Sequence, residues 1–168
     1  MSKYLPYEKI VYRSHLDPKE IIRRIEENTE PYKKFKLFGD FNDGELKYFN
    51  GSIEGDSFKL TRIMNYRNSF APMIKGNVET DENGSKITVK MSLHTIVKIF
   101  IYFWVSSVLT AFFSLLSSIF IERKFSPEIL LLFGMLVFIF MLMVFGFKYE
   151  SDKSKKYLAH LFETEIKE

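Results

Sequence analysis

The sequence contains no cysteine among its 168 residues. Disulfide bonds, thiolate metal ligands and cysteine nucleophiles are therefore excluded together. The sequence also lacks a strong charge of either sign, because 24 Lys and Arg stand against 21 Asp and Glu, a formal net charge of +3. Proteins that bind duplex nucleic acid usually carry a larger and clustered basic excess, so we expect no nucleic-acid partner.

Catalytic and cofactor-binding motifs are missing as well. The sequence has no G-x-S-x-G elbow, no P-loop and no dinucleotide-binding fingerprint. His15, His94 and His160 fall in three different predicted elements, without carboxylates at a matching spacing, which argues against a metal site. We therefore expect no enzyme and no cofactor, and interpret the chain as a protein that acts by binding.

Two long stretches without any charged residue are the clearest positive feature, at 99–121 and 129–147. As α-helices they reach about 34 and about 28 Å, close to the hydrocarbon core of a bilayer at about 30 Å. Tyr102 and Trp104 lie near the start of the first stretch, where aromatic rings are typical of the membrane interface. We predict two transmembrane helices, at 96–121 and 129–147.

The segment between these helices, 122–128, is short enough to force a tight antiparallel hairpin. Its orientation follows from Lys and Arg, which are retained on the cytoplasmic side. The turn has only Arg123 and Lys124, whereas the tail at 148–168 is richer in lysine. We expect an extracytoplasmic turn and two cytoplasmic termini, in agreement with a chain start that lacks the apolar core of a signal peptide.

The first predicted span carries small residues at four-residue spacing, namely Ser106, Thr110, Ser114 and Ser118. Such residues form a flat stripe on which the backbone of another helix packs closely. Our preferred interpretation is packing against the protein's own second helix at Gly134. The alternative is a seam for another protein or a second copy of the chain.

Residues 1–95 are predicted to form a cytoplasmic α+β domain, an antiparallel sheet with one helix against its apolar face. The helix is expected over 17–30, because Asp17 suits the N-cap and Pro18 the first helical position. Alternating apolar residues predict five strands, near 8–14, 47–54, 57–64, 70–80 and 86–95.

The tail at 148–168 begins with polar residues and then places apolar ones at helical spacing, namely Leu158, Leu161, Phe162 and Ile166. This pattern predicts a short amphipathic helix. Docking on the protein's own domain is our preferred interpretation, and lying on the inner membrane surface is the alternative.

The stretch "TRIMNYRNSFAPMIKG" concentrates cationic, phenolic and amide donors around a predicted turn, namely Arg62, Tyr66, Arg67, Asn68 and Lys75. Such donors suit an anionic group such as a lipid phosphate. The competing and simpler interpretation is a polar turn between two strands.

The pattern "FNGSIEGDSFKLTR" followed by "YRNSFAPMIKG", ahead of two spans, resembles small uncharacterised bacterial membrane proteins with two spans. The resemblance covers about residues 49–110. It implies a bacterial inner-membrane setting and brings no activity and no functional residues.

From these features we expect an accessory, regulatory or protective membrane protein, with an immunity-type protein as one version. Its partners would be membrane lipid and either another membrane protein or a second copy of itself. One alternative is a subunit of a small oligomeric channel or transporter. The other is a lipid-binding or lipid-modifying domain at the membrane surface.

Overall fold

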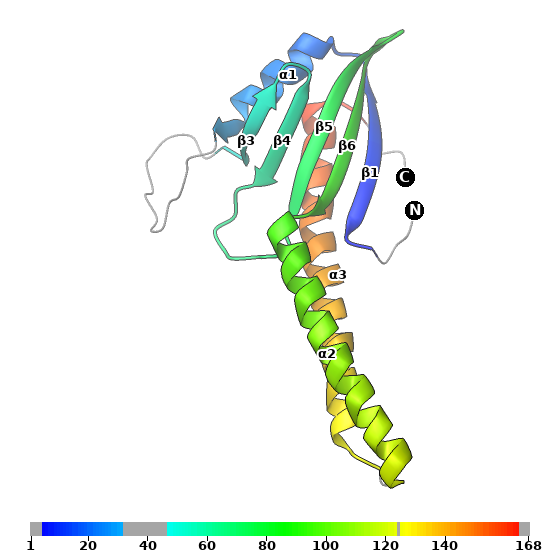
Figure 1. Cartoon of the computed structure of the whole chain (residues 1–168). Helices are drawn as coiled ribbons and strands as arrows, with labels where there is room; N and C mark the ends of the chain where they lie inside the picture. The colour runs from blue at the N-terminus through cyan, green and yellow to red at the C-terminus, as the bar shows by residue number, and fades with distance from the viewer. Residues whose placement is uncertain (1–4, 32–46, 124, 165–168) are drawn as a thin grey trace.

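The computed structural model describes residues 5–31, 47–123 and 125–164, and combines a sheet domain with a long helical hairpin that projects from one end of it (Figure 1). Six strands form one sheet in the order β1-β6-β5-β4-β3-β2. Their bounds are β1 (Tyr7–Ser14), β2 (Thr29–Pro31), β3 (Phe49–Glu54), β4 (Ser57–Arg62), β5 (Pro72–Asp81) and β6 (Gly84–Leu93).

The sheet is mixed, which corrects the predicted antiparallel sheet. Four of the neighbouring pairs are antiparallel, but β2 runs parallel to β3. The prediction missed β2 because it extended the first helix to residue 30. Helix α1 (Pro18–Glu27) ends earlier, at an Asn28 cap, so the next residues are free to extend beside β3.

Helix α1 begins as its sequence predicts. The Asp17 side chain accepts a hydrogen bond from the Lys19 backbone N–H at 2.9 Å, and Pro18 occupies the first helical position. Ile21 and Ile25 are fully buried, so the helix rests on the sheet through one narrow apolar face. The α+β class of the domain is confirmed.

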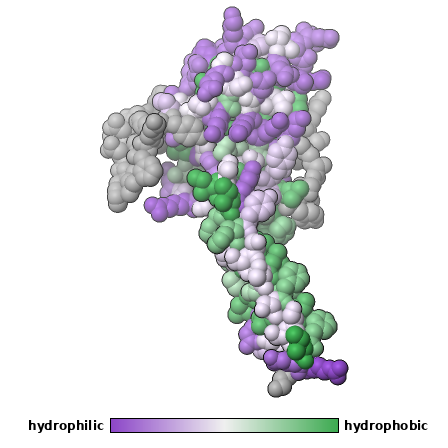
Figure 2. Space-filling model, viewed as in Figure 1, coloured by the Kyte–Doolittle hydropathy of each residue, from purple (hydrophilic) through white to green (hydrophobic). Residues whose placement is uncertain are grey.

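The hairpin consists of α2 (Thr95–Glu122) and α3 (Glu128–Leu161), and both helices are long and apolar enough to cross a membrane. Within the hairpin most large apolar side chains of α2 remain exposed, for example Phe120 at 77% and Ile121 at 82%. Figure 2 shows these hydrophobic surfaces along the hairpin and hydrophilic ones over the sheet domain and at the tip.

Helix α3 continues well past residue 147, where the second span was predicted to end. The polar residues that follow are compatible with a helix, and no proline interrupts them before Leu161. The predicted separate tail helix is therefore the last part of α3. It packs against the sheet, with Leu158 and Phe162 fully buried, whereas Ile166 lies outside the described residues.

One face of the sheet carries the core and the other is open. Helices α1 and α3 lie on the same face, behind the sheet in Figure 1. The core joins strand residues such as Leu60, Ile74 and Val89 to Phe147 and Leu158 of α3. Residues 1–95 alone therefore lack part of the core on which they fold.

Candidate functional site at the junction of α3 with the sheet

A fully buried carboxylate marks the point where α3 enters the domain. Glu150 accepts hydrogen bonds from the Arg62 guanidinium and from the Tyr66 hydroxyl. Arg62 is the last residue of β4, and its side chain lies on the helix-covered face of the sheet. Tyr66 belongs to the loop that follows β4. Because an unpaired buried carboxylate costs several kcal/mol, these two donors are a condition for α3 to pack here.

Both donors keep their protons at neutral pH. Burial works to lower the pKa of Arg62, but the hydrogen bond to Glu150 and the further interactions with Tyr48, Glu150 and Tyr66 together outweigh it, so the pKa is raised. Burial raises the pKa of Tyr66, and the neighbouring Glu150 raises it further. Arg62 and Tyr66 therefore remain protonated hydrogen-bond donors to Glu150 at neutral pH.

A second carboxylate, Glu8, makes a similar connection on β1, three places from β4 in the strand order. It is 7% exposed and pairs with Lys148, with Lys155 at 3.1 Å and with the Ser151 hydroxyl at 2.9 Å. Burial alone would raise the pKa of Glu8, but the bonds from these three α3 residues outweigh it and the pKa is lowered. Glu8 therefore stays ionised in the folded protein.

A glycine allows a third contact, between α3 and the loop joining β4 to β5. The Asn68 amide donates to the backbone carbonyl of Gly146 at 3.1 Å. A Cβ at Gly146 would lie 3.1 Å from the Cβ of Phe70 and 3.3 Å from the side-chain oxygen of Asn68, which is closer than ordinary contacts. The missing side chain lets the loop rest on the helix.

The structure separates the five residues that the sequence grouped as an anion-binding cluster. Arg62, Tyr66 and Asn68 meet at α3, where each already has a partner. Arg67 is exposed in the loop, and Lys75 is exposed on the open face of the sheet. A ligand that uses all five at once does not fit this arrangement.

Sequence reasoning missed Glu8 and Glu150 as parts of this junction. The signal for Glu8 was present, because it alternates in phase with Ile10 and Tyr12 and so belongs to the inward face of β1. The signal for Glu150 was weaker. It stands among lysines directly after an apolar run, and only the continuation of α3 carries it under the sheet.

The small residues of α2 face away from α3. The stripe residues Ser106, Thr110, Ser114 and Ser118 are all exposed in the hairpin. Two of them bond back to their own helix, Thr110 to the Ser106 carbonyl at 2.9 Å and Ser118 to the Ser114 carbonyl at 3.3 Å. At Gly134 a Cβ would meet no atom of the described chain within 4 Å, so α3 does not cover the stripe there.

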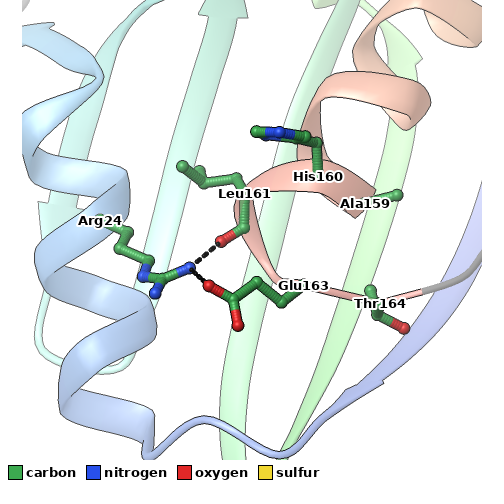
Figure 3. Close-up of a pocket in the computed structure, with 6 residues that line it drawn as sticks. All are labelled: Arg24, Ala159, His160, Leu161, Glu163 and Thr164. Carbon is green, nitrogen blue, oxygen red and sulfur yellow. Dashed lines mark hydrogen bonds and ion pairs between the residues drawn. The ribbon is translucent and has the colours of Figure 1, made fainter.

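A shallow hollow at the C-terminal end of α3 is lined by residues that already bond to one another (Figure 3). Arg24 of α1 donates to the Leu161 carbonyl at 3.2 Å and pairs with Glu163 at 2.7 Å. These bonds fasten the end of α3 to α1 and leave the guanidinium satisfied. We therefore assign these contacts a structural role.

No protein-family model matches this chain, and no curated protein or solved structure with significant similarity to it was found.

Proposed function

We propose that the protein is an integral membrane protein of the bacterial inner membrane that acts by binding and performs no catalysis. Its two spans would be the apolar parts of α2 and α3, with the sheet domain in the cytoplasm. The exposed apolar side chains of the hairpin support this placement, because a surface of this kind suits lipid and is unfavourable in water.

The orientation of the hairpin rests on the positions of Lys and Arg. The turn holds Arg123 and Lys124, the latter outside the described residues, whereas lysines are frequent on the domain side of both helices. Positively charged flanks are kept in the cytoplasm. The domain and both termini would then share the cytoplasmic side.

The unbroken path of α3 from the hairpin into the core of the domain is the observation that carries the proposal. Glu8 and Glu150 tie this helix to β1 and β4 through ion pairs whose carboxylates are buried. A domain that is merely tethered needs only a flexible linker. We infer an accessory, regulatory or protective protein, with immunity to a membrane-acting toxin as one version, that presents hairpin and domain to its partner as one rigid body.

A small oligomeric channel or transporter subunit is the second candidate. The exposed stripe at Ser106, Thr110, Ser114 and Ser118 favours it, because small residues on a membrane helix allow another helix to approach. A lipid-modifying role has less support, since Arg62, Tyr66 and Asn68 are engaged by α3.

Membrane placement is tested by labelling, for which the natural absence of cysteine is convenient. The variants are Arg123→Cys in the turn and Lys156→Cys on the exposed side of α3. An impermeant thiol reagent should label position 123 in intact cells and position 156 only after lysis. The reverse pattern would refute the orientation, and release of the protein by alkaline carbonate would refute integral insertion.

The binding role is tested by photo-crosslinking in native membranes. A photoreactive amino acid replaces Ser114 on the stripe, and Phe133 on the exposed side of α3 is the matched control. An adduct of twice the protomer mass at Ser114 alone supports the oligomeric candidate. An adduct with another protein supports the accessory role. If Ser114, Phe133 and further sites on the domain give adducts with lipid and with no protein, the proposal of a protein partner is refuted.

A further inference from the structure

Four lysines stand directly opposite one another on the open face of the sheet. The strand register pairs Lys9 with Lys90, Lys90 with Lys75, and Lys75 with Lys59. They form one row, the lysine row, that crosses β1, β6, β5 and β4. Adjacent strands lie about 4.8 Å apart, so the row is about 14 Å long at the backbone.

The lysine row faces solvent, on the side of the sheet that α1 and α3 leave uncovered. Its four residues are exposed, whereas their strand neighbours Leu60, Ile74 and Val89 are buried in the core. Figure 2 shows hydrophilic side chains over the face of the sheet that is turned toward the viewer. The row is therefore accessible in the described part of the chain.

The charge of the row is uncompensated among the described residues. None of the four lysines forms an ion pair there. On the same four strands, the adjacent positions of this face hold neutral residues, among them Thr88, Asn77, Ser92 and Thr61. Glu30 and Glu54 stand beyond the row, on β2 and β3.

Such a row carries an energetic cost, because like charges directly opposite one another on a sheet repel. The half-buried His94 reports the same positive surroundings, since burial and then the nearby Lys59 lower its pKa. An anionic surface brought against this face would relieve the repulsion. The sheet is thus better suited to a complex with an anion than to water alone.

The row also lies at the end of the domain that joins the hairpin. Strand β6 ends at Leu93 and α2 begins at Thr95. The 28 residues of α2 reach about 42 Å, close to the thickness of a bilayer including its headgroups, about 40–45 Å. The end of the sheet would therefore meet the headgroup surface.

The distance from the row to that surface is within electrostatic range. Lys90 precedes the end of β6 by three residues, which span about 10 Å in a strand. The Debye length at physiological salt is about 8 Å, and a lysine side chain extends the charge beyond the backbone. The strands run lengthwise toward the hairpin (Figure 1). With the hairpin in the bilayer, a row that crosses the strands would run along the membrane surface.

We propose that the lysine row docks on the anionic phospholipid surface of the cytoplasmic leaflet and sets the tilt of the whole molecule. The inference rests on the membrane placement proposed above. Since α3 fixes the domain to the hairpin, attraction of the row to the leaflet tilts both together toward the open face. Membrane helices tolerate tilts of about 20° on average, so the required movement is within the ordinary range.

The chemistry of the open face favours lipid over other anionic partners. Protein interfaces are anchored by buried aromatic or arginine side chains, and the positions that flank the row on its four strands are mostly small and polar. Single-stranded nucleic acid requires several stacking rings, and this face of the four strands carries only Tyr7 at one corner. A fluid layer of phosphates needs charge alone, which lysine supplies without fixed geometry.

The experiment uses the full-length protein in nanodiscs of phosphatidylcholine, with or without phosphatidylglycerol. A donor dye on Thr88→Cys, beside the row, reports energy transfer to an acceptor on lipid headgroups. A dye on Glu27→Cys of α1, at the other face, is the matched control position. We expect higher transfer from position 88 with phosphatidylglycerol, and loss of the difference at about 1 M salt, where the Debye length is about 3 Å.

The charge variant replaces Lys59, Lys75 and Lys90 with Gln, and should lose the lipid-dependent transfer. The control variant replaces Lys19, Lys86 and Lys156 with Gln, which removes the same charge outside the row and should keep it. Because all three row positions are exposed, the row variant should melt at or above the wild-type temperature.

Equal transfer in both lipid mixtures would overturn the docking of the row on lipid, and so would equal losses in the two triple variants. Binding of the row to an acidic protein, with no lipid dependence, would overturn it in favour of a protein partner. A chain that enters the nanodiscs but shows no lipid-dependent transfer refutes only the role of the row. A chain that fails to enter them refutes the proposed membrane placement as well.

Discussion

Arg62 and Glu150 form a buried ion pair between the last residue of β4 and the part of α3 that lies beyond its apolar stretch. Glu150 is completely buried, and the Arg62 side chain is 16% exposed. The pair joins the sheet to α3, the helix that continues from the hairpin. Removing the pair should therefore weaken the packing of α3 against the sheet.

Glu150→Ala should destabilise the protein by roughly 3 kcal/mol, because it leaves Arg62 as an unpaired and largely buried cation. The change is measured as a lower unfolding midpoint in mild detergent. Arg67→Gln in the same loop is the control, and as an exposed substitution it should stay within about 0.5 kcal/mol. An unaltered midpoint for Glu150→Ala would contradict the assigned role of the pair.

The stability of the protein should fall in acid through Glu8. The pKa of this carboxyl is lowered from its ordinary value of 4.5 in the folded protein, so its contribution is complete above pH 4.5 and is lost as the pH falls through the lowered pKa. Glu8→Gln should therefore be less stable than wild type at neutral pH, and the two should converge below pH 4.5.

Unfolding midpoints across this pH range measure the effect. Glu82→Gln, in the exposed turn between β5 and β6, provides a matched change of charge. A gap between wild type and Glu8→Gln that stays constant with pH would show that the substitution acts through packing alone.

Gly146→Leu should destabilise the junction, because the new side chain would overlap Phe70 and Asn68 in the loop that rests on α3. Overpacking of this kind costs about 1–3 kcal/mol. Gly134→Leu on the same helix is the control, since a Cβ there meets no described atom within 4 Å. Hydrogen exchange should increase in the loop from Ile63 to Ala71 for the first variant only, and equal exchange in both would count against the contact.

Ser114→Leu should leave the stability of the full-length protein in detergent unchanged, because this residue is exposed on the side of α2 that α3 does not cover. Val108→Ala should cost about 1 kcal/mol, since Val108 is buried in the hairpin. Detergent melting of the two variants provides the test. A loss of stability for Ser114→Leu and none for Val108→Ala would place the helix contact on the opposite side.

The sequence was sufficient for features that depend on local patterns. Three such features are the Asp17 cap, the alternation in β6 and the uncharged stretches of α2 and α3. Each can be recognised from residues that are consecutive in the sequence. At the end of α3 the structure differs from the prediction. The polar composition after residue 147 indicates a separate tail helix, whereas α3 continues to Leu161. Polarity there reflects ion pairs with Glu8 rather than a break in the helix.

Features that depend on strand pairing were out of reach. Lys9, Lys59, Lys75 and Lys90 each occupy an ordinary outward position of a predicted strand, and nothing local connects them. Only the register of four strands brings them into one row. Arg62 and Lys75 were grouped because they are near in sequence, but they end on opposite faces of the sheet.

The course of α3 also has a consequence for biosynthesis. Strands β1 to β6 leave the ribosome first, yet Phe147, Leu158 and Phe162, which cover part of their inner face, are made only at the end of the second apolar stretch or beyond it. Until these residues are made, apolar side chains of the sheet such as Ile74 and Val89 are only partly covered. Exposed apolar surface of this kind is prone to aggregation. Maturation of this domain is therefore coupled to completion of the hairpin, and the N-terminal part of the chain reaches its final form last.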